Sequence, residues 1–288
     1  MTSTDWVDTD EDGVDDRWQE GPGEPDSRVR SVKQPTTTEV APTTTGAPSG
    51  STVDLQPTPI ERKADEPLRV VLTGDSIADQ WAPYFEWILG STATIEHRHL
   101  WGTALCDWFA ESGGDRGLEY LESWDPHLYI VDHGGNGMTP CMADAAGLQL
   151  AGEAYTAKYL ADIEYVLELA SRTDSRVLLV DQPVSRGNLR SGTGELYRSM
   201  PIQYPGGLVR FFSTWPAITP SGQFLQSVPC EVYEPGCVDG RGELRESFPN
   251  VHLETLGAWR YAMAIVDELV LAGWVGDELV YSGDRPMP

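Results

Sequence analysis

The stretch LRVVLTGDSIADQW, residues 68–81, decides the fold and raises the first question about function. It is an apolar run that ends abruptly at Gly74-Asp75-Ser76 and then becomes polar with helical spacing. A buried strand followed by a tight turn and a helix is the repeating unit of α/β folds. The serine either caps the helix or is a nucleophile at the carboxyl end of a strand. The rest of the chain has to distinguish these two roles.

Strands and helices alternate beyond this first unit. We expect strands over residues 69–74, 92–97, 127–133 and 176–182, and helices over residues 78–89, 117–124, 151–170 and 253–274. Such alternation implies right-handed crossovers and a parallel sheet covered on both faces. Residues 183–229 lack these patterns, and we expect them to be irregular and to wall a pocket.

The charge of the chain excludes several classes of function. Among 288 residues, 45 are acidic and 20 are basic, so the formal charge is −25. Binding to nucleic acids or to anionic membranes needs clustered Lys and Arg, and we expect neither. No run of 18 apolar residues is present, which predicts no membrane span. We expect a monomer.

The amino-terminal part differs in amino-acid composition from the rest of the chain. Residues 1–30 are acidic and Gly-rich, residues 31–66 are rich in Thr and Pro, and the apolar runs begin only afterwards. Such Thr/Pro-rich sequence is typical of extended linkers and extracellular stalks. We therefore expect an acidic segment, a linker and one domain over residues 67–288.

A possible calcium loop lies in the acidic segment. Asp8, Asp10 and Asp12 alternate and precede a glycine, as in the first half of an EF-hand loop, and Asp16 is a further possible ligand. Gln19 stands where that loop has its bidentate Glu, and no flanking helices are expected. A solvated acidic tail is the alternative that we favour.

Four cysteines predict two disulfide bonds. Their spacing fits neither a zinc site nor a redox CxxC motif, and an even number in loop-like sequence favours disulfides over four reduced thiols. Cys230 and Cys237 form the natural local pair, which leaves Cys106 with Cys141. Disulfides indicate a secreted or cell-surface protein, although the start of this sequence lacks the features of a signal peptide.

Four candidate site positions follow the expected strands or precede the last helix. Ligands of open parallel sheets bind beyond the carboxyl ends of the strands, where Ser76, Gly102 and Asn136 lie, and His252 precedes the last helix. A serine nucleophile needs a base and preformed donors for the oxyanion. We expect Ser76 as nucleophile, His252 as base, and the donors to be the Ser76 and Gly102 amides with the Asn136 side chain.

This order of blocks resembles the SGNH (GDSL-type) hydrolase family over about residues 67–275. The segments WGTALCDW and GGNGMTPCM also resemble sequences of secreted actinobacterial SGNH proteins and of SGNH domains of sugar O-acyltransferases. The resemblance implies a three-layer flavodoxin-like α/β fold and the roles given above. It also implies chemistry that requires no cofactor.

The chain departs from the family pattern where the family places its acid. That position, three residues before the histidine, is Pro249, and Gly137 replaces the Asp that usually follows the Asn. Either a backbone carbonyl or a carboxylate such as Glu246 must orient His252. We favour a Ser-His dyad with a backbone carbonyl, because Glu246 has to fold back to reach the histidine.

The expected activity is that of a serine esterase. It removes a small acyl group, with acetyl favoured, from a carbohydrate or similar small-molecule ester through an acyl-enzyme. One alternative is an O-acyltransferase that uses the same acyl-enzyme. The other is a non-catalytic carbohydrate- or wall-binding module, which the proline at position 249 favours.

Overall fold

Five parallel strands form the central sheet of the molecule. The computed structural model describes residues 60–63, 66–185, 192–247 and 252–276. The strands are β1 (Leu68–Gly74), β2 (Ala93–His99), β3 (Leu128–Asp132), β4 (Arg176–Asp181) and β5 (Val209–Ser213), and all neighbours pair in parallel. Their order, β2-β1-β3-β4-β5, is that of flavodoxin-like folds. The predicted α/β fold class is confirmed.

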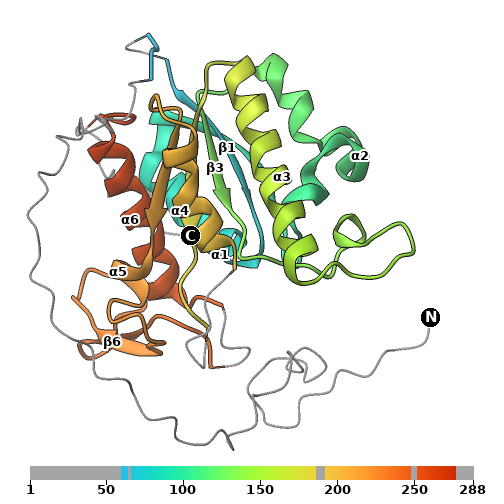
Figure 1. The fold of residues 1–288 in the computed structure, drawn as a ribbon. Coiled ribbons are helices and arrows are strands. Elements are labelled where there is room, and N and C mark those ends of the chain that lie inside the picture. Colours follow the sequence, from blue (N-terminus) through green and yellow to red (C-terminus); the bar gives the residue numbers. More distant parts are fainter. Residues whose placement is uncertain (1–59, 64–65, 186–191, 248–251, 277–288) are drawn as a thin grey trace, which may run out of the picture. The chain divides into compact units, whose positions relative to one another are not determined.

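Helices cover both faces of this sheet. The α-helices are α1 (Ser76–Leu89), α2 (Ala110–Gly113), α3 (Gly152–Arg172), α4 (Thr193–Gln203), α5 (Trp215–Ile218) and α6 (Thr255–Leu271). Figure 1 shows α6 on one side of β1 and β3 and α3 on the other. Because strand side chains alternate between faces, Val70 and Leu72 pack with α1 and α6, whereas Val71 packs with α3 and α4. The three layers of the predicted fold are therefore present.

Short elements fill the connections. The 3₁₀ helices are η2 (Gly90–Thr92), η3 (Leu105–Trp108), η4 (Gly114–Arg116), η5 (Leu118–Trp124) and η6 (Pro140–Met142), and β6 (Ser227–Pro229) pairs antiparallel with β7 (Arg241–Glu243). The helix expected over residues 117–124 is thus a 3₁₀ helix. It ends before Asp125, whose left-handed φ of 54° cannot continue a helix. A segment of only seven residues is too short to form a stable α-helix.

The prediction that residues 183–229 are irregular was wrong. This part of the chain contributes α4, the edge strand β5, the short helix α5 and β6. The sequence patterns of this part are weak. The strand β5 is only partly buried beyond Val209, so it lacks the continuous apolar run of a central strand. In α4, Pro201 interrupts the helical pattern, while Tyr197 and Met200 are fully buried.

The domain begins before the expected boundary at residue 67. Ile60 packs against the core on the α1 and α6 face, and Glu66 forms an ion pair with Arg69 of β1. Residues 1–59 lie outside the described part of the chain, so the acidic segment and the linker stay predictions. The same holds for the calcium ligands Asp8, Asp10, Asp12 and Asp16.

Both predicted disulfide bonds are present. Cys106 of η3 is bonded to Cys141 of η6, and Cys230 is bonded to Cys237. The first joins the segment after the Gly102 loop to the segment after the Asn136 loop. Across the described ranges, no helix has the length and apolar character that a membrane crossing requires.

Candidate active site

Ser76 is the first residue of α1, directly beyond the end of β1. The turn is tight: a Cβ on Gly74 would lie 2.2 Å from the Ala78 Cβ and 2.8 Å from the Asp132 carbonyl oxygen. Only glycine fits there, which explains the glycine of the GDS stretch. Ser76 is partly exposed, and the amino terminus of a helix favours negative charge near its hydroxyl.

The buried Asp75 carboxylate connects this turn to neighbouring segments through hydrogen bonds. Its Oδ1 accepts hydrogen bonds from the Ile77 amide at 3.0 Å and from Gln182 Nε2 at 2.9 Å. Its Oδ2 accepts from the Gly134 amide at 2.7 Å. Burial raises the pKa of Asp75, and these donors and the nearby charge of His252 oppose that rise. One buried carboxyl group thus joins β1, the loop after β3 and the end of β4.

A second buried carboxyl group lies at the end of β3. Asp132 accepts from Trp81 Nε1 at 2.5 Å and from the Tyr261 hydroxyl at 3.0 Å, which ties α1 and α6 to the sheet. Burial, and then the neighbouring Asp75 charge, raise the pKa of Asp132. Sequence patterns gave no sign of this network, because Trp81 and Tyr261 occupy ordinary core positions of their helices.

The Gly102 loop is fixed to the end of β1. Gly102 has a φ of +77°, a left-handed conformation that favours glycine. The Leu100 amide donates to the Gly74 carbonyl oxygen at 3.4 Å. The Thr103 hydroxyl donates to the Leu100 carbonyl oxygen at 2.7 Å and lies 3.2 Å from the same Gly74 oxygen. The loop therefore lies beside the turn that carries Ser76.

Asn136 lies between the Gly102 loop and Asp75. Its Nδ2 donates to the Thr103 carbonyl oxygen at 3.1 Å and makes a longer contact of 3.4 Å with Asp75 Oδ2. Its backbone carbonyl accepts from the Tyr159 hydroxyl of α3 at 3.1 Å. The Tyr197 hydroxyl of α4 supports the same loop at the His133 carbonyl, also at 3.1 Å. The two tyrosines were not expected from the sequence, because both read as core residues.

His252 lies next to Glu246. The distance between His252 Nδ1 and Glu246 Oε2 is 3.4 Å, and the side chains are 26% and 32% exposed, respectively. An isolated antiparallel bridge between Arg245 and Leu253 folds the chain back, and the Glu246 amide donates to the His252 carbonyl oxygen at 3.1 Å. The carboxylate thus reaches the histidine despite the sequence distance. Pro249 lies outside the described residues.

Gln80 holds this segment against α1. Its Oε1 accepts from the Leu253 amide at 2.7 Å, and its Nε2 donates to the Leu253 carbonyl oxygen at 2.9 Å. The same Nε2 lies 3.3 Å from Glu246 Oε1. Gln80 follows Ser76 by four residues, so both side chains lie on one face of α1. This face brings the nucleophile turn and the histidine segment together.

Arg245 fixes the other side of the histidine segment. Its Nε donates to the His252 carbonyl oxygen at 3.1 Å, and its guanidinium also donates to the Val184 carbonyl oxygen at 3.1 Å. The side chain is almost fully buried, and burial lowers the pKa of Arg245 to about 10. Neither Gln80 nor Arg245 was expected to contribute to the site.

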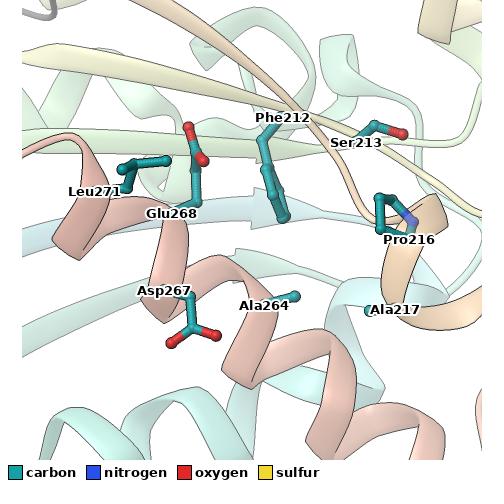
Figure 2. A pocket seen from close by; sticks show the side chains of 8 residues that line it. All are labelled: Phe212, Ser213, Pro216, Ala217, Ala264, Asp267, Glu268 and Leu271. Carbon is teal, nitrogen blue, oxygen red and sulfur yellow. The ribbon is translucent and has the colours of Figure 1, made fainter.

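The described residues contain no cluster of three or more His, Cys, Asp or Glu side chains that could hold a metal ion. One cavity, of about 240 Å³, lies between β5, α5 and α6 and is lined by none of the motif residues. Figure 2 shows the side chains that line it: Phe212, Ser213, Pro216, Ala217, Ala264, Asp267, Glu268 and Leu271. None of them belongs to the candidate active site.

Comparisons with known proteins give structural matches only. No family model and no curated protein matches the chain. A GDSL-like lipase from Bacteroides thetaiotaomicron is 17% identical with a TM-score of 0.44, and the match covers 71% of this chain and 89% of the lipase. A catalytic mutant of Axe2, an acetylxylan esterase from Geobacillus stearothermophilus, is 13% identical with a TM-score of 0.49, covering 74% and 98%. The chain resembles these hydrolases in fold. The roles of its site residues rest on its own geometry.

Proposed function

We propose that the protein is a serine esterase that removes small acyl groups, foremost acetyl, from carbohydrate or similar esters. One observation supports this most directly: four separate segments meet at the carboxyl edge of the sheet. They are the Ser76 turn, the Gly102 loop, the Asn136 loop and the His252 segment, and hydrogen bonds connect each of them to a neighbour. Helix capping alone would not require a base, a carboxylate and two donor loops at the same place.

In the first half of the reaction, Ser76 forms the acyl-enzyme. Its Oγ attacks the ester carbonyl carbon while His252 takes the hydroxyl proton at Nε2. The C–O bond to the alcohol then breaks, and the same proton passes to the departing alkoxide. In the second half, His252 deprotonates a water molecule that attacks the acyl-enzyme, and the proton returns to Ser76 as the acid leaves.

The oxyanion formed in each half needs donors. The backbone amides of Ser76 and Gly102 and the side chain of Asn136 supply them in this proposal. Both hydrogens of Asn136 Nδ2 point to protein oxygens, but the 3.4 Å contact with Asp75 is long for a hydrogen bond. We expect this weakly engaged hydrogen to be shared with the substrate oxygen, while the bond to Thr103 holds the amide in place.

Glu246 is the third member of the catalytic unit in this proposal. Its carboxylate lies beside Nδ1, so in this proposal Nε2 is the nitrogen that accepts the Ser76 proton. This geometry favours a triad over the dyad expected from the sequence. The disulfides further support a protein that works in an oxidising, extracytoplasmic environment.

A fluorophosphonate probe tests the proposal, because it reacts with activated serines only. We expect one label per chain, on Ser76, and none in Ser76→Ala. The purified protein is then assayed on acetylated sugars and on esters of longer acids, with and without a sugar acceptor. Failure to label Ser76 would favour a binding module, and acyl transfer to the acceptor in place of release would favour an acyltransferase.

A further inference from the structure

A second cavity, of about 290 Å³, adjoins the candidate active site. Gly102 and Thr103 form part of its wall, together with Trp101, Trp108, Arg116 and Thr139. The wall thus includes the loop that supplies a proposed oxyanion donor. An ester whose carbonyl oxygen lies at that donor has one substituent close to this cavity.

Two side chains of the cavity are unused by the fold. Trp101 is 71% exposed, although large aromatic residues are usually well buried. Arg116 is also exposed, and within the described ranges no hydrogen bond or ion pair engages either its guanidinium or the Trp101 indole. The fold gains little from them, so both are available to a ligand.

The polar groups of the wall suit a neutral ligand with several hydroxyl groups. Asp107 also lines the cavity, and its charge balances that of Arg116. Ser112 and Thr139 add hydroxyl groups that both donate and accept. A sugar ring offers an apolar C–H face for the Trp101 indole and hydroxyl groups for the rim. A long acyl chain would leave these polar groups unpaired, and an anionic ring would meet the Asp107 carboxylate.

The position of the cavity is fixed relative to the reacting atoms. The Gly102 loop is bonded to the end of β1, and the Cys106–Cys141 disulfide joins the two segments that flank the cavity. Trp108 Nε1 contacts the Thr103 hydroxyl at 3.3 Å, so this wall is supported from the core. A ligand held here keeps a constant distance from the oxyanion donors.

We propose that this cavity is the subsite for the alcohol part of the substrate and that it takes a neutral sugar ring stacked on Trp101. The proposal rests on the proposed function and names its substrate class. Trp101 is a specificity-determining residue here, and it acts on binding of the sugar ester and has no part in proton transfer.

The experiment compares two esters in the full chain and three variants. The sugar ester is an acetylated xylo-oligosaccharide, and the ester without a ring is ethyl acetate. For Trp101→Ala we expect kcat/KM on the sugar ester to fall about tenfold more than on ethyl acetate, since lost aromatic contact is on that scale. Trp101→Phe should recover most of the loss. Tyr120→Ala, which removes an aromatic that is 59% exposed outside the cavity, is the matched control.

Binding of the sugar without the ester is measured separately by calorimetry with unacetylated xylotriose. This arm needs no turnover, so it separates failure of the subsite from failure of the proposed function. Xylotriose should bind the wild-type chain and Tyr120→Ala equally and bind Trp101→Ala much more weakly. Equal losses on both esters, equal binding by all variants, or tighter binding of trigalacturonate than of xylotriose would overturn the proposal.

Discussion

The nucleophile side and the base side of the candidate site are built differently. On the nucleophile side, Asp75 is 3% exposed and bonded to three segments, and a disulfide joins the loops beside it. On the base side, the His252 side chain is 26% exposed, and its segment is held by an isolated bridge at the adjacent Leu253 and by the side chains of Gln80 and Arg245. The serine is thus placed by the folded core, whereas the histidine is placed by a few side chains at its edge.

This difference predicts different consequences of mutation. Substitutions of the buried residues that hold the Ser76 turn, such as Asp75, should affect stability as well as activity. Changes around His252 remove single contacts of partly exposed groups, so they should reduce kcat with little effect on folding. The following predictions test this contrast, beginning with the largest effect.

Ser76→Ala and His252→Ala should each reduce kcat by about 10⁴-fold or more, because members of one catalytic unit act together. The double variant should lose little beyond either single variant. Steady-state kinetics checks the rates, and thermal unfolding checks that both variants keep the wild-type Tm. A double variant whose losses multiply would show that the two residues do not act as one unit.

Glu246→Gln should reduce kcat by about 10⁴-fold, the scale seen when the acid of a triad is neutralised. The amide keeps the size of the side chain but cannot stabilise the imidazolium formed during catalysis. Glu243→Gln, at an exposed position of β7, is the matched control and should retain activity. If Glu246→Gln retains most of its activity, the Ser-His dyad expected from the sequence is right.

Local sequence patterns predicted the positions of the Ser76 turn and the Gly-rich loops better than the surroundings of His252. The apolar run, the GDS turn and the Gly-rich loops are short-range features, so their positions at the sheet edge follow from the parallel topology. The approach of Glu246 to His252 depends on an isolated bridge between Arg245 and Leu253, which leaves no periodic signal. Gln80 reads as any polar residue of an amphipathic helix. Such contacts depend on tertiary packing and need a structure.

Gln80→Leu should lower kcat by about 10- to 100-fold, as loss of a group that orients a catalytic residue does. Gln80 is a positioning residue in this proposal, because it bonds the Leu253 backbone and contacts Glu246. A positioning role predicts an unchanged KM and a changed pH profile of kcat, with recovery in part by Gln80→Asn. A lower Tm with normal kcat would indicate a purely structural role.

Removing the two disulfides separately should give different results. The double variant Cys106→Ala/Cys141→Ala should lose about 2–4 kcal/mol of stability and several-fold in kcat, because it frees the loops that carry two donors. Cys230→Ala/Cys237→Ala is the matched control, since this pair lies away from the donors and should leave kcat unchanged. Denaturant unfolding and steady-state kinetics check both. Equal losses of kcat would mean that the first disulfide has no special relation to the site.

The smallest effect concerns His133, which is fully buried on the nucleophile side. Burial lowers the pKa of His133 to about 3 from its ordinary value of 6.5, so the unfolded chain binds a proton here that the folded chain does not. Its contribution to stability is therefore complete above pH 6.5 and is lost as the pH falls towards 3, by at most about 1.4 kcal/mol per pH unit.

Asp75 and Asp132 act in the opposite direction, because burial raises their pKa values and protonation favours the folded state. Only the difference in the pH dependence of stability between the wild type and a variant isolates the contribution of His133. His133→Gln should lose less stability than the wild type between pH 6.5 and 4, as measured by denaturant unfolding. Equal slopes for His133→Gln and the wild type would mean that His133 accepts a proton in the folded state, and that the nucleophile side is less closed to water than its burial indicates.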